Sequence, residues 1–169
     1  NAYDIGATED AQSVVAKDET NVVAPGTANE VDFVFAYDEY SDVIKAPEVD
    51  YKFKVDATVA VPADTTNGVI DTLDENPNFV WTLDGDEYQT AAELQDAIEA
   101  LTGTGADAGD GYVKYEANTL PAAFNDAEHA NKHTIGWRWD YEAGQDALDT
   151  ALGNADNLET LSVTVSISA

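Results

Sequence analysis

The sequence predicts an all-β protein, a β-sandwich with one short helix near residues 90–102. Apolar side chains alternate with polar ones in several separate segments, turn-forming residues divide these segments, and a single stretch has helical periodicity. Strict alternation is typical of half-buried strands, and several short strands divided by turns are typical of a sandwich. At 169 residues the chain is long enough for one domain with a sizeable core.

Two segments carry the clearest alternation. One begins at Val31, and the longest runs from Tyr51 to Val61, where Pro62 ends it. Further alternating apolar positions are Phe33, Phe35 and Tyr37 in the first segment, Phe53, Val55, Ala57 and Val59 in the second, and then Phe79, Trp81 and Leu83, the stretch from Tyr112 to Tyr115, and Leu161, Val163, Val165 and Ile167. Each of these segments is predicted to be a strand with one buried face.

The segment "HTIGWRWDY" adds a strand with a heavily aromatic face. Trp137 and Trp139 share that face with Ile135 and Tyr141, while Arg138 points the other way. We expect Trp81, Trp137 and Trp139 to be core aromatics, because large side chains on one strand face bury much apolar area. The alternative is an exposed aromatic platform on Trp137 or Trp139 that binds carbohydrate.

The helix is predicted in "TAAELQDAIEALTG". One face of this helix carries four apolar residues, Leu94, Ala97, Ile98 and Leu101. Thr90 followed by Glu93 forms a capping-box pattern, and Gly103 is a plausible C-terminal stop. Because this apolar face is narrow, we expect the helix to cover an edge or end of the sandwich.

The charge is strongly negative, with 34 acidic residues against 7 basic ones and a formal net charge of -27. Such a surface repels nucleic acid and anionic lipid. It favours either solubility in high salt or an assembly tuned by divalent cations, and both readings predict a dependence on ionic strength.

Cysteine and methionine are both absent, and position 1 is an asparagine. We therefore expect no disulfide and interpret Asn1 as a processed end left by a removed signal peptide. No apolar stretch approaches the roughly 18 residues that span a bilayer, so no membrane insertion of the mature chain is expected.

Residues with catalytic or metal-binding potential form no convincing constellation. His129 and His133 have i, i+4 spacing, but Ala130 stands where a zinc peptidase needs glutamate, and no third ligand is evident. Weak calcium candidates are Asp84 and Asp86 in "LDGDEY" and Asp107 and Asp110 in the glycine-rich loop, although solvated acidic turns explain them better. We expect no enzymatic activity and no cofactor beyond a possible calcium ion.

Residues 1–20 precede the first convincing strand and form an N-terminal arm. Within them Tyr3, Ile5 and Ala7 alternate with small or polar residues. Such an arm can add a strand to its own sheet or to that of a neighbouring molecule. Composition leaves an intramolecular edge strand, a disordered end and a donated strand all open.

Several short motifs resemble the TasA and camelysin type of secreted matrix-fibre proteins. The first strands are similar in "NVVAPGTANEVDFVF" and "APEVDYKFKVDATV", and the tail is similar in "GWRWDYEAGQDALDTALG" and "LETLSVTVSIS". The anchors are residues 24–27, 47–49 and 149–153 together with Trp137 and Trp139. The extreme acidity and the end of the sequence at Ala169 depart from the family pattern.

The resemblance implies a jelly-roll sandwich, export with a dedicated signal peptidase, and homopolymeric fibres of a biofilm matrix or cell surface. In such fibres the arm of one subunit completes the sheet of the next, so Tyr3, Ile5 and Ala7 would be donor residues and residues 21–169 the domain that accepts them. The predicted function is therefore an extracellular filament subunit. The alternative is a monomeric carbohydrate-binding sandwich.

Overall fold

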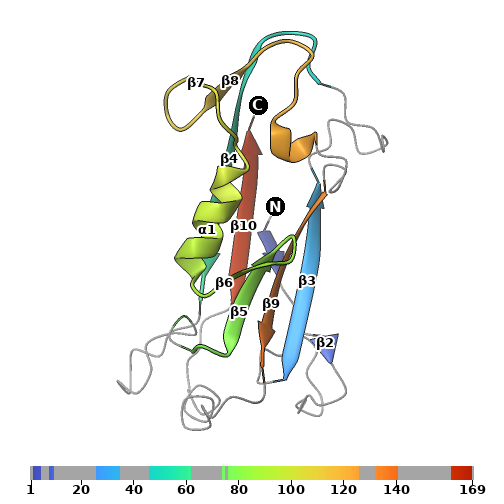
Figure 1. The fold of residues 1–169 in the computed structure, drawn as a ribbon, viewed down its shortest axis with the longest axis vertical. Helices are drawn as coiled ribbons and strands as arrows, with labels where there is room; N and C mark the ends of the chain where they lie inside the picture. Colours follow the sequence, from blue (N-terminus) through green and yellow to red (C-terminus); the bar gives the residue numbers. More distant parts are fainter. Residues whose placement is uncertain are drawn as a thin grey trace.

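The computed structural model describes residues 2–4, 8–9, 26–34, 46–61, 74, 76–125, 132–140 and 161–168. These residues form two antiparallel sheets of five strands each (Figure 1). Sheet A has the strand order β1-β10-β4-β8-β7, built from Ala2–Asp4, Ser162–Ser168, Tyr51–Ala60, Val113–Tyr115 and Ala106–Asp107. Sheet B has the order β2-β3-β9-β5-β6, built from Thr8–Glu9, Thr27–Val34, Lys132–Trp139, Phe79–Leu83 and Asp86–Tyr88.

The two sheets pack around one hydrophobic core, which confirms the predicted sandwich. Phe53 and Val55 from sheet A and Phe79 and Trp81 from sheet B belong to the same buried cluster. Burying each such side chain stabilises the fold by roughly 1.5–3 kcal/mol. Of the positions predicted on apolar strand faces, Phe35, Tyr37 and Tyr141 lie outside the described residues.

The chain crosses between the two sheets several times. β3 lies in sheet B, β4 in sheet A and β5 in sheet B, and after β9 in sheet B the chain returns to sheet A with β10. Such crossing is typical of a β-sandwich, the fold class that was expected. It places the late strand β10 next to β4 over its whole length, from Ser162 opposite Ala60 to Ser168 opposite Lys54.

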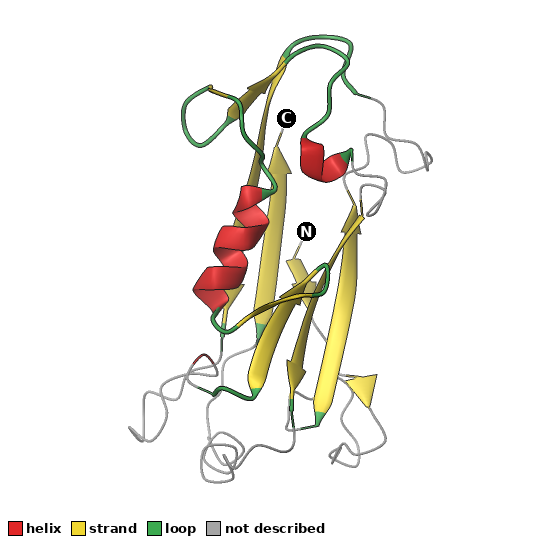
Figure 2. Ribbon diagram, in the orientation of Figure 1, coloured by secondary structure: helices red, strands yellow, loops and turns green. Residues whose placement is uncertain are grey.

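The predicted helix is α1, Ala91–Ala100 (Figure 2). Thr90 accepts a hydrogen bond from the Glu93 backbone N–H at 3.2 Å, the Glu93 side chain accepts one from the Thr90 N–H, and Gly103 follows with φ 82°. These contacts confirm the capping box and the glycine stop. No helix in the part of the chain that the structure describes is long and apolar enough to cross a membrane.

The two sides of the sandwich are closed by different elements. α1 packs against β4 of sheet A and against β5 and β6 of sheet B, so it bridges the sheets along one side. On the opposite side the outermost strands are β1 in sheet A and β2 in sheet B, both from the N-terminal arm. Figure 1 shows α1 beside β4 and the arm strands near β10 and β3. The sandwich therefore has a helix side and an arm side.

Candidate functional site

The two described pieces of the N-terminal arm are edge strands, one in each sheet. β1 pairs with β10, with Tyr3 opposite Val163, and β2 pairs with β3, with Thr8 opposite Ala28. Within a single chain the described pieces of the arm are therefore intramolecular edge strands, which is one of the alternatives that the sequence left open. Of the predicted donor residues, Ile5 and Ala7 lie outside the described residues.

The described residues of the arm pair with only part of each long edge. β1 pairs with β10 from Ser162 to Thr164, and among the described residues no strand pairs with the same edge of β10 at positions 165–168. On its other edge β10 is paired with β4 from end to end. The N–H and C=O groups of an unpaired edge are a ready template for another strand.

The apolar side chains of β10 become less buried beyond the residues that pair with β1. Leu161 and Val163 are each 3% exposed, whereas Val165 and Ile167 pack against the core but are only partly buried. An added strand along positions 165–168 would cover these two side chains. The uncovered edge is therefore also the place where the core is incompletely shielded from water.

The composition of β10 does not protect this edge. The segment "LSVTVSIS", residues 161–168, contains no charged residue and no proline, although the chain carries a net charge of -27. Natural edge strands are commonly protected from pairing by lysine, inward-pointing charges or proline. An incoming strand would therefore meet no charged side chain on β10 that opposes pairing with this edge.

Asp84, one of the weak calcium candidates, is engaged in a contact that the sequence did not indicate. Its Oδ1 accepts a hydrogen bond from the Thr134 backbone N–H at 2.8 Å, and its Oδ2 lies 2.6 Å from Nδ1 of His133. The Asp84 side chain is 16% exposed and that of His133 is 2% exposed. The predicted turn is present, but its first carboxylate is not solvated, and both of its oxygens already have protein partners.

His133 lies on strand β9 and not on the helix that an i, i+4 pair of metal ligands needs, and His129 lies outside the described residues. Its Nε2 is 2.9 Å from the carbonyl oxygen of Ala123, and its ring lies against those of Phe33 and Phe124. Both ring nitrogens face acceptors. His133 therefore joins β9 to the β5–β6 turn and to the short 3-10 helix Ala122–Phe124.

The remaining calcium candidates are solvent-exposed. Asp86 is exposed, and so are Asp107 and Asp110 in the glycine-rich loop, where Asp107 Oδ1 accepts the Gly109 N–H at 2.8 Å. Within the described part of the chain no three His, Cys, Asp or Glu side chains gather as metal ligands would. These carboxylates give no basis for a site.

The three tryptophans belong to the core. Trp81, Trp137 and Trp139 are 0%, 2% and 4% exposed, and Phe79 stacks on Trp137 with ring centroids 5.7 Å apart. A sugar-binding platform needs an exposed ring face, so the carbohydrate alternative loses the residues on which it depended.

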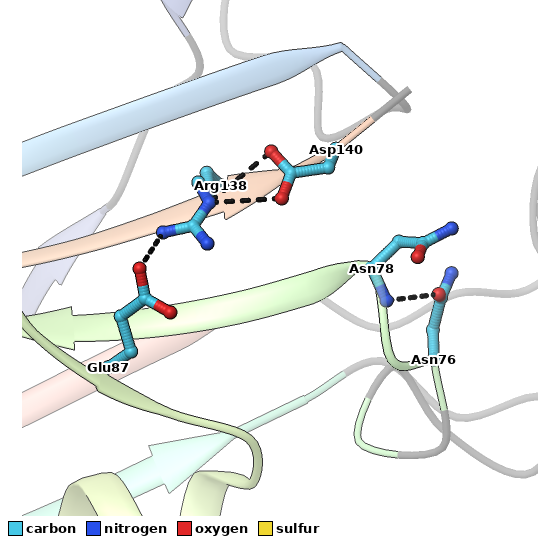
Figure 3. Close-up of polar contacts among 5 residues, drawn as sticks. All are labelled: Asn76, Asn78, Glu87, Arg138 and Asp140. Carbon is cyan, nitrogen blue, oxygen red and sulfur yellow. Dashed lines mark hydrogen bonds and ion pairs between the residues drawn. The ribbon is translucent and has the colours of Figure 1, made fainter. Parts of the chain in front are cut away.

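Arg138 points to the outer face of sheet B, as its position in the alternation predicts. Its guanidinium donates to Glu87 at 2.7 Å and to Asp140 at 3.1 Å (Figure 3). The hydrogen bond with Arg138 lowers the pKa of Glu87, and the bond to Glu87 raises the pKa of Arg138. Nearby, the Asn76 side chain caps the start of β5 by accepting the Asn78 N–H at 2.9 Å. The contacts of Arg138 form a surface network that holds β6 to β9, whereas Asn76 and Asn78 are buried.

Comparisons with models of protein families, with curated proteins and with solved structures found no match. Function is therefore argued from the residues and their geometry. The sequence analysis did not identify the edge of β10 at positions 165–168, which no described strand covers, although one signal for it was present. An alternating strand with no charge, late in a very acidic chain, is a candidate for pairing with another strand.

Proposed function

We propose that the protein is the structural subunit of a homopolymeric filament, in which the N-terminal arm of one subunit adds a strand to the next. The observation that carries the proposal is the partial cover of β10. The arm's own strand β1 pairs with three residues of β10 and leaves the edge at positions 165–168 without a described strand. A longer donated strand would complete this edge.

The register supports a specific arrangement. Within the chain Asp4 is opposite Ser162, and a donated arm shifted by four residues would place Asp4 opposite Ser166. A shift by an even number keeps each residue on the same face of the sheet. In this register residues 2–8 span all of β10, and Tyr3, Ile5 and Ala7 lie opposite Ile167, Val165 and Val163. Tyr3 and Ile5 would then cover the partly buried Ile167 and Val165, and Ala7 would lie opposite the buried Val163.

The intramolecular pairing does not reach this register because the arm serves two sheets. Residues 2–4 pair with β10 in sheet A, whereas Thr8 and Glu9 pair with β3 in sheet B. An arm received from another subunit is free of that constraint. Exchange of an identical element between copies adds backbone hydrogen bonds along β10 without requiring a new fold.

The sequence motifs that resemble secreted matrix-fibre proteins point the same way. Head-to-tail donation is a heterologous contact, which propagates into a filament unless it closes a ring. With a charge of -27 per subunit, assembly should be opposed at low salt, and calcium or magnesium should favour bundles by bridging acidic faces. We propose export and assembly at the cell surface or in an extracellular matrix.

Electron microscopy tests the polymer. The chain should form filaments in high salt, and a chain lacking residues 1–8 should not. Because that deletion also removes β1 and β2, Ile5→Asp provides a second variant, with Asn1→Asp as a control of equal added charge outside residues 2–8. Loss of filaments with Ile5→Asp but not with Asn1→Asp is expected. Dispersed particles from the intact chain at every salt concentration would overturn the proposal.

Engineered disulfides test the register, since the chain contains no cysteine. Residues directly opposite each other on neighbouring antiparallel strands have Cα atoms about 4.5–5.5 Å apart, a separation compatible with a disulfide. Asp4→Cys with Ser166→Cys should give covalent ladders between subunits on a non-reducing gel. Asp4→Cys with Ser162→Cys reports the intramolecular register and should give cross-linked monomers. Monomers alone from both pairs, in samples that contain filaments, would rule out the shifted register.

A further inference from the structure

Two lysines face each other on the outer surface of sheet A. Lys52 on β4 is directly opposite Lys114 on β8, and both side chains are exposed. Like charges at directly opposite positions of a sheet destabilise it by roughly 0.2–1 kcal/mol. The ammonium of Lys52 lies 4.1 Å from the centre of the Tyr112 ring, and this cation–π contact holds it in place.

These two lysines differ from the other described cations. Lys54 is paired with Asp56, Lys132 with Asp32, and Arg138 with Glu87 and Asp140. Among the described residues no carboxylate lies within ion-pair distance of Lys52 or Lys114. The neighbouring Asp50 instead accepts the Ala117 backbone N–H at 3.0 Å. In a chain with 34 acidic residues and 7 basic ones, two adjacent unpaired lysines are unexpected.

The surrounding face is also poor in acids. The outward residues of β4 and β10 are Lys52, Lys54, Asp56, Thr58, Ala60 and the four hydroxyl residues Ser162, Thr164, Ser166 and Ser168. Together with Lys114, the charged side chains on these strands are three lysines and one aspartate, a net charge of +2, whereas the whole chain carries -27. The outer face formed by β4, β8 and β10 is therefore complementary to the acidic remainder of the chain.

We propose that Lys52 and Lys114 form a docking surface for carboxylates of a second copy of this chain. The argument is charge complementarity, because another copy brings a dense acidic surface and neither lysine has an ion-pair partner among the described residues of its own subunit. The proposal rests on the filament function and adds the surface by which subunits or filaments associate side by side. We call Lys52, Lys114 and Tyr112 the lysine surface.

The test compares two variants of equal net charge. Lys52→Gln with Lys114→Gln removes two positive charges from the lysine surface. Ala92→Glu with Ala100→Glu adds two negative charges at exposed positions of α1. Thermal unfolding of both variants establishes that the fold is kept. Lateral association of filaments is measured by electron microscopy and light scattering, and association of the arm-deleted chain by sedimentation, each at moderate salt.

We expect the glutamine variant to form single filaments but to need about five- to tenfold more protein for lateral association, consistent with two exposed ion pairs. The glutamate control should change this concentration by less than twofold. Equal weakening by both variants, or no change with the glutamine variant, would overturn the proposal. A glutamine variant whose lateral association is unchanged but which no longer binds polyglutamate would also overturn the proposal. The lysine surface would then bind an anionic polymer and not a second copy of this chain. Absence of filaments from every chain would reject the filament function instead, and sedimentation would still test the lysine surface.

Discussion

Asp84 Oδ2 lies 2.6 Å from His133 Nδ1, and this part-buried contact fastens the β5–β6 hairpin turn to β9, the strand next to β5 in the sheet. Asp84 and Gly85 have φ angles of 54° and 88°, which are typical of a two-residue type I′ turn between β5 and β6. The Asp84 backbone N–H also donates to the Thr134 carbonyl at 2.9 Å. One residue thus makes the turn and bonds to β9 through three of its atoms.

Substitution of Asp84 should reduce stability in a graded way. Asp84→Ala leaves the Thr134 N–H and a buried His133 nitrogen without their acceptor and also places alanine at positive φ, so we expect a loss of about 3–5 kcal/mol. Asp84→Asn tolerates the left-handed backbone and can still accept from Thr134, so a loss of about 1–2 kcal/mol is expected. Urea unfolding measures both values.

Asp86→Ala is the matched control for these two variants. Asp86 belongs to the same hairpin but is exposed. Its replacement should change the free energy of unfolding by less than about 0.5 kcal/mol. Equal effects of alanine at positions 84 and 86 would mean that the contact with His133 contributes nothing to stability.

The strands and the helix could be predicted because their signals are local. The alternation from Tyr51 to Val61 and the capping box at Thr90 depend on residues that are neighbours in the sequence. Which strand lies beside which could not be predicted in the same way. That β10 pairs with β4 on one edge and only briefly with β1 on the other depends on contacts between distant segments.

The polar contacts of the candidate residues also needed the three-dimensional structure. "LDGDEY" contains Asp-Gly between two alternating strands, which is the strongest short-range signal of a hairpin, and the acidic turn was predicted. His133 lies 49 residues later in the sequence, so nothing near Asp84 indicates its partner. In the same way, the pairing of Lys52 with Lys114 follows from the β4–β8 register and not from either local sequence.

Gly136 lies in the middle of β9 where neighbouring strands approach closely. A Cβ at this position would lie 2.7 Å from Thr82 Oγ1, 3.0 Å from the Asn29 carbonyl oxygen and 3.2 Å from Glu30 Cβ. Because strands on both sides would have to shift, Gly136→Ala should destabilise the protein by about 1–3 kcal/mol. Thermal or urea unfolding gives the measurement.

A double variant separates crowding from other effects at this position. Thr82→Ala removes the closest atom, so Thr82→Ala with Gly136→Ala should be more stable than the sum of the two single changes predicts. The backbone contact with Asn29 remains, so the rescue should be partial. If Gly136→Ala alone is as stable as the natural chain, the close approach of β3 and β5 to β9 is not as described.

Asp74 links stability to pH through helix α1. Burial raises the pKa of its carboxyl, against the opposing effect of the hydrogen bond from the Ala91 N–H, whose length is 2.9 Å. The folded state therefore holds this proton more tightly than the unfolded state, so the contribution of Asp74 to stability falls as pH rises through the raised pKa. At neutral pH the charged carboxylate is less favourable than a neutral side chain in its place.

Asp74→Asn removes the charge and keeps an oxygen that can accept from Ala91, but it also replaces the oxygen available to the Trp81 side chain, whose hydrogen bond lowers the pKa of Asp74. At pH 7 the variant should be as stable as the natural chain or more stable, by less than about 1 kcal/mol, since the carboxyl is only half-buried and water screens its charge. The difference should vanish below the ordinary pKa of aspartate. A variant that is less stable at pH 7 would show that attraction to the helix N-terminus outweighs burial.

The net charge of -27 should make the stability of the single subunit depend on salt. Raising sodium chloride from 0.01 M to 1 M shortens the Debye length from about 30 Å to about 3 Å and so screens the repulsion among the 34 acidic side chains. We expect the Tm of the Ile5→Asp variant, which should not polymerise, to rise by about 5 °C or more over this range. Chloride is preferred to sulfate because sulfate also strengthens apolar burial. A Tm that is unchanged by salt would mean that self-repulsion does not limit the fold, and the opposition to assembly at low salt would then need another cause.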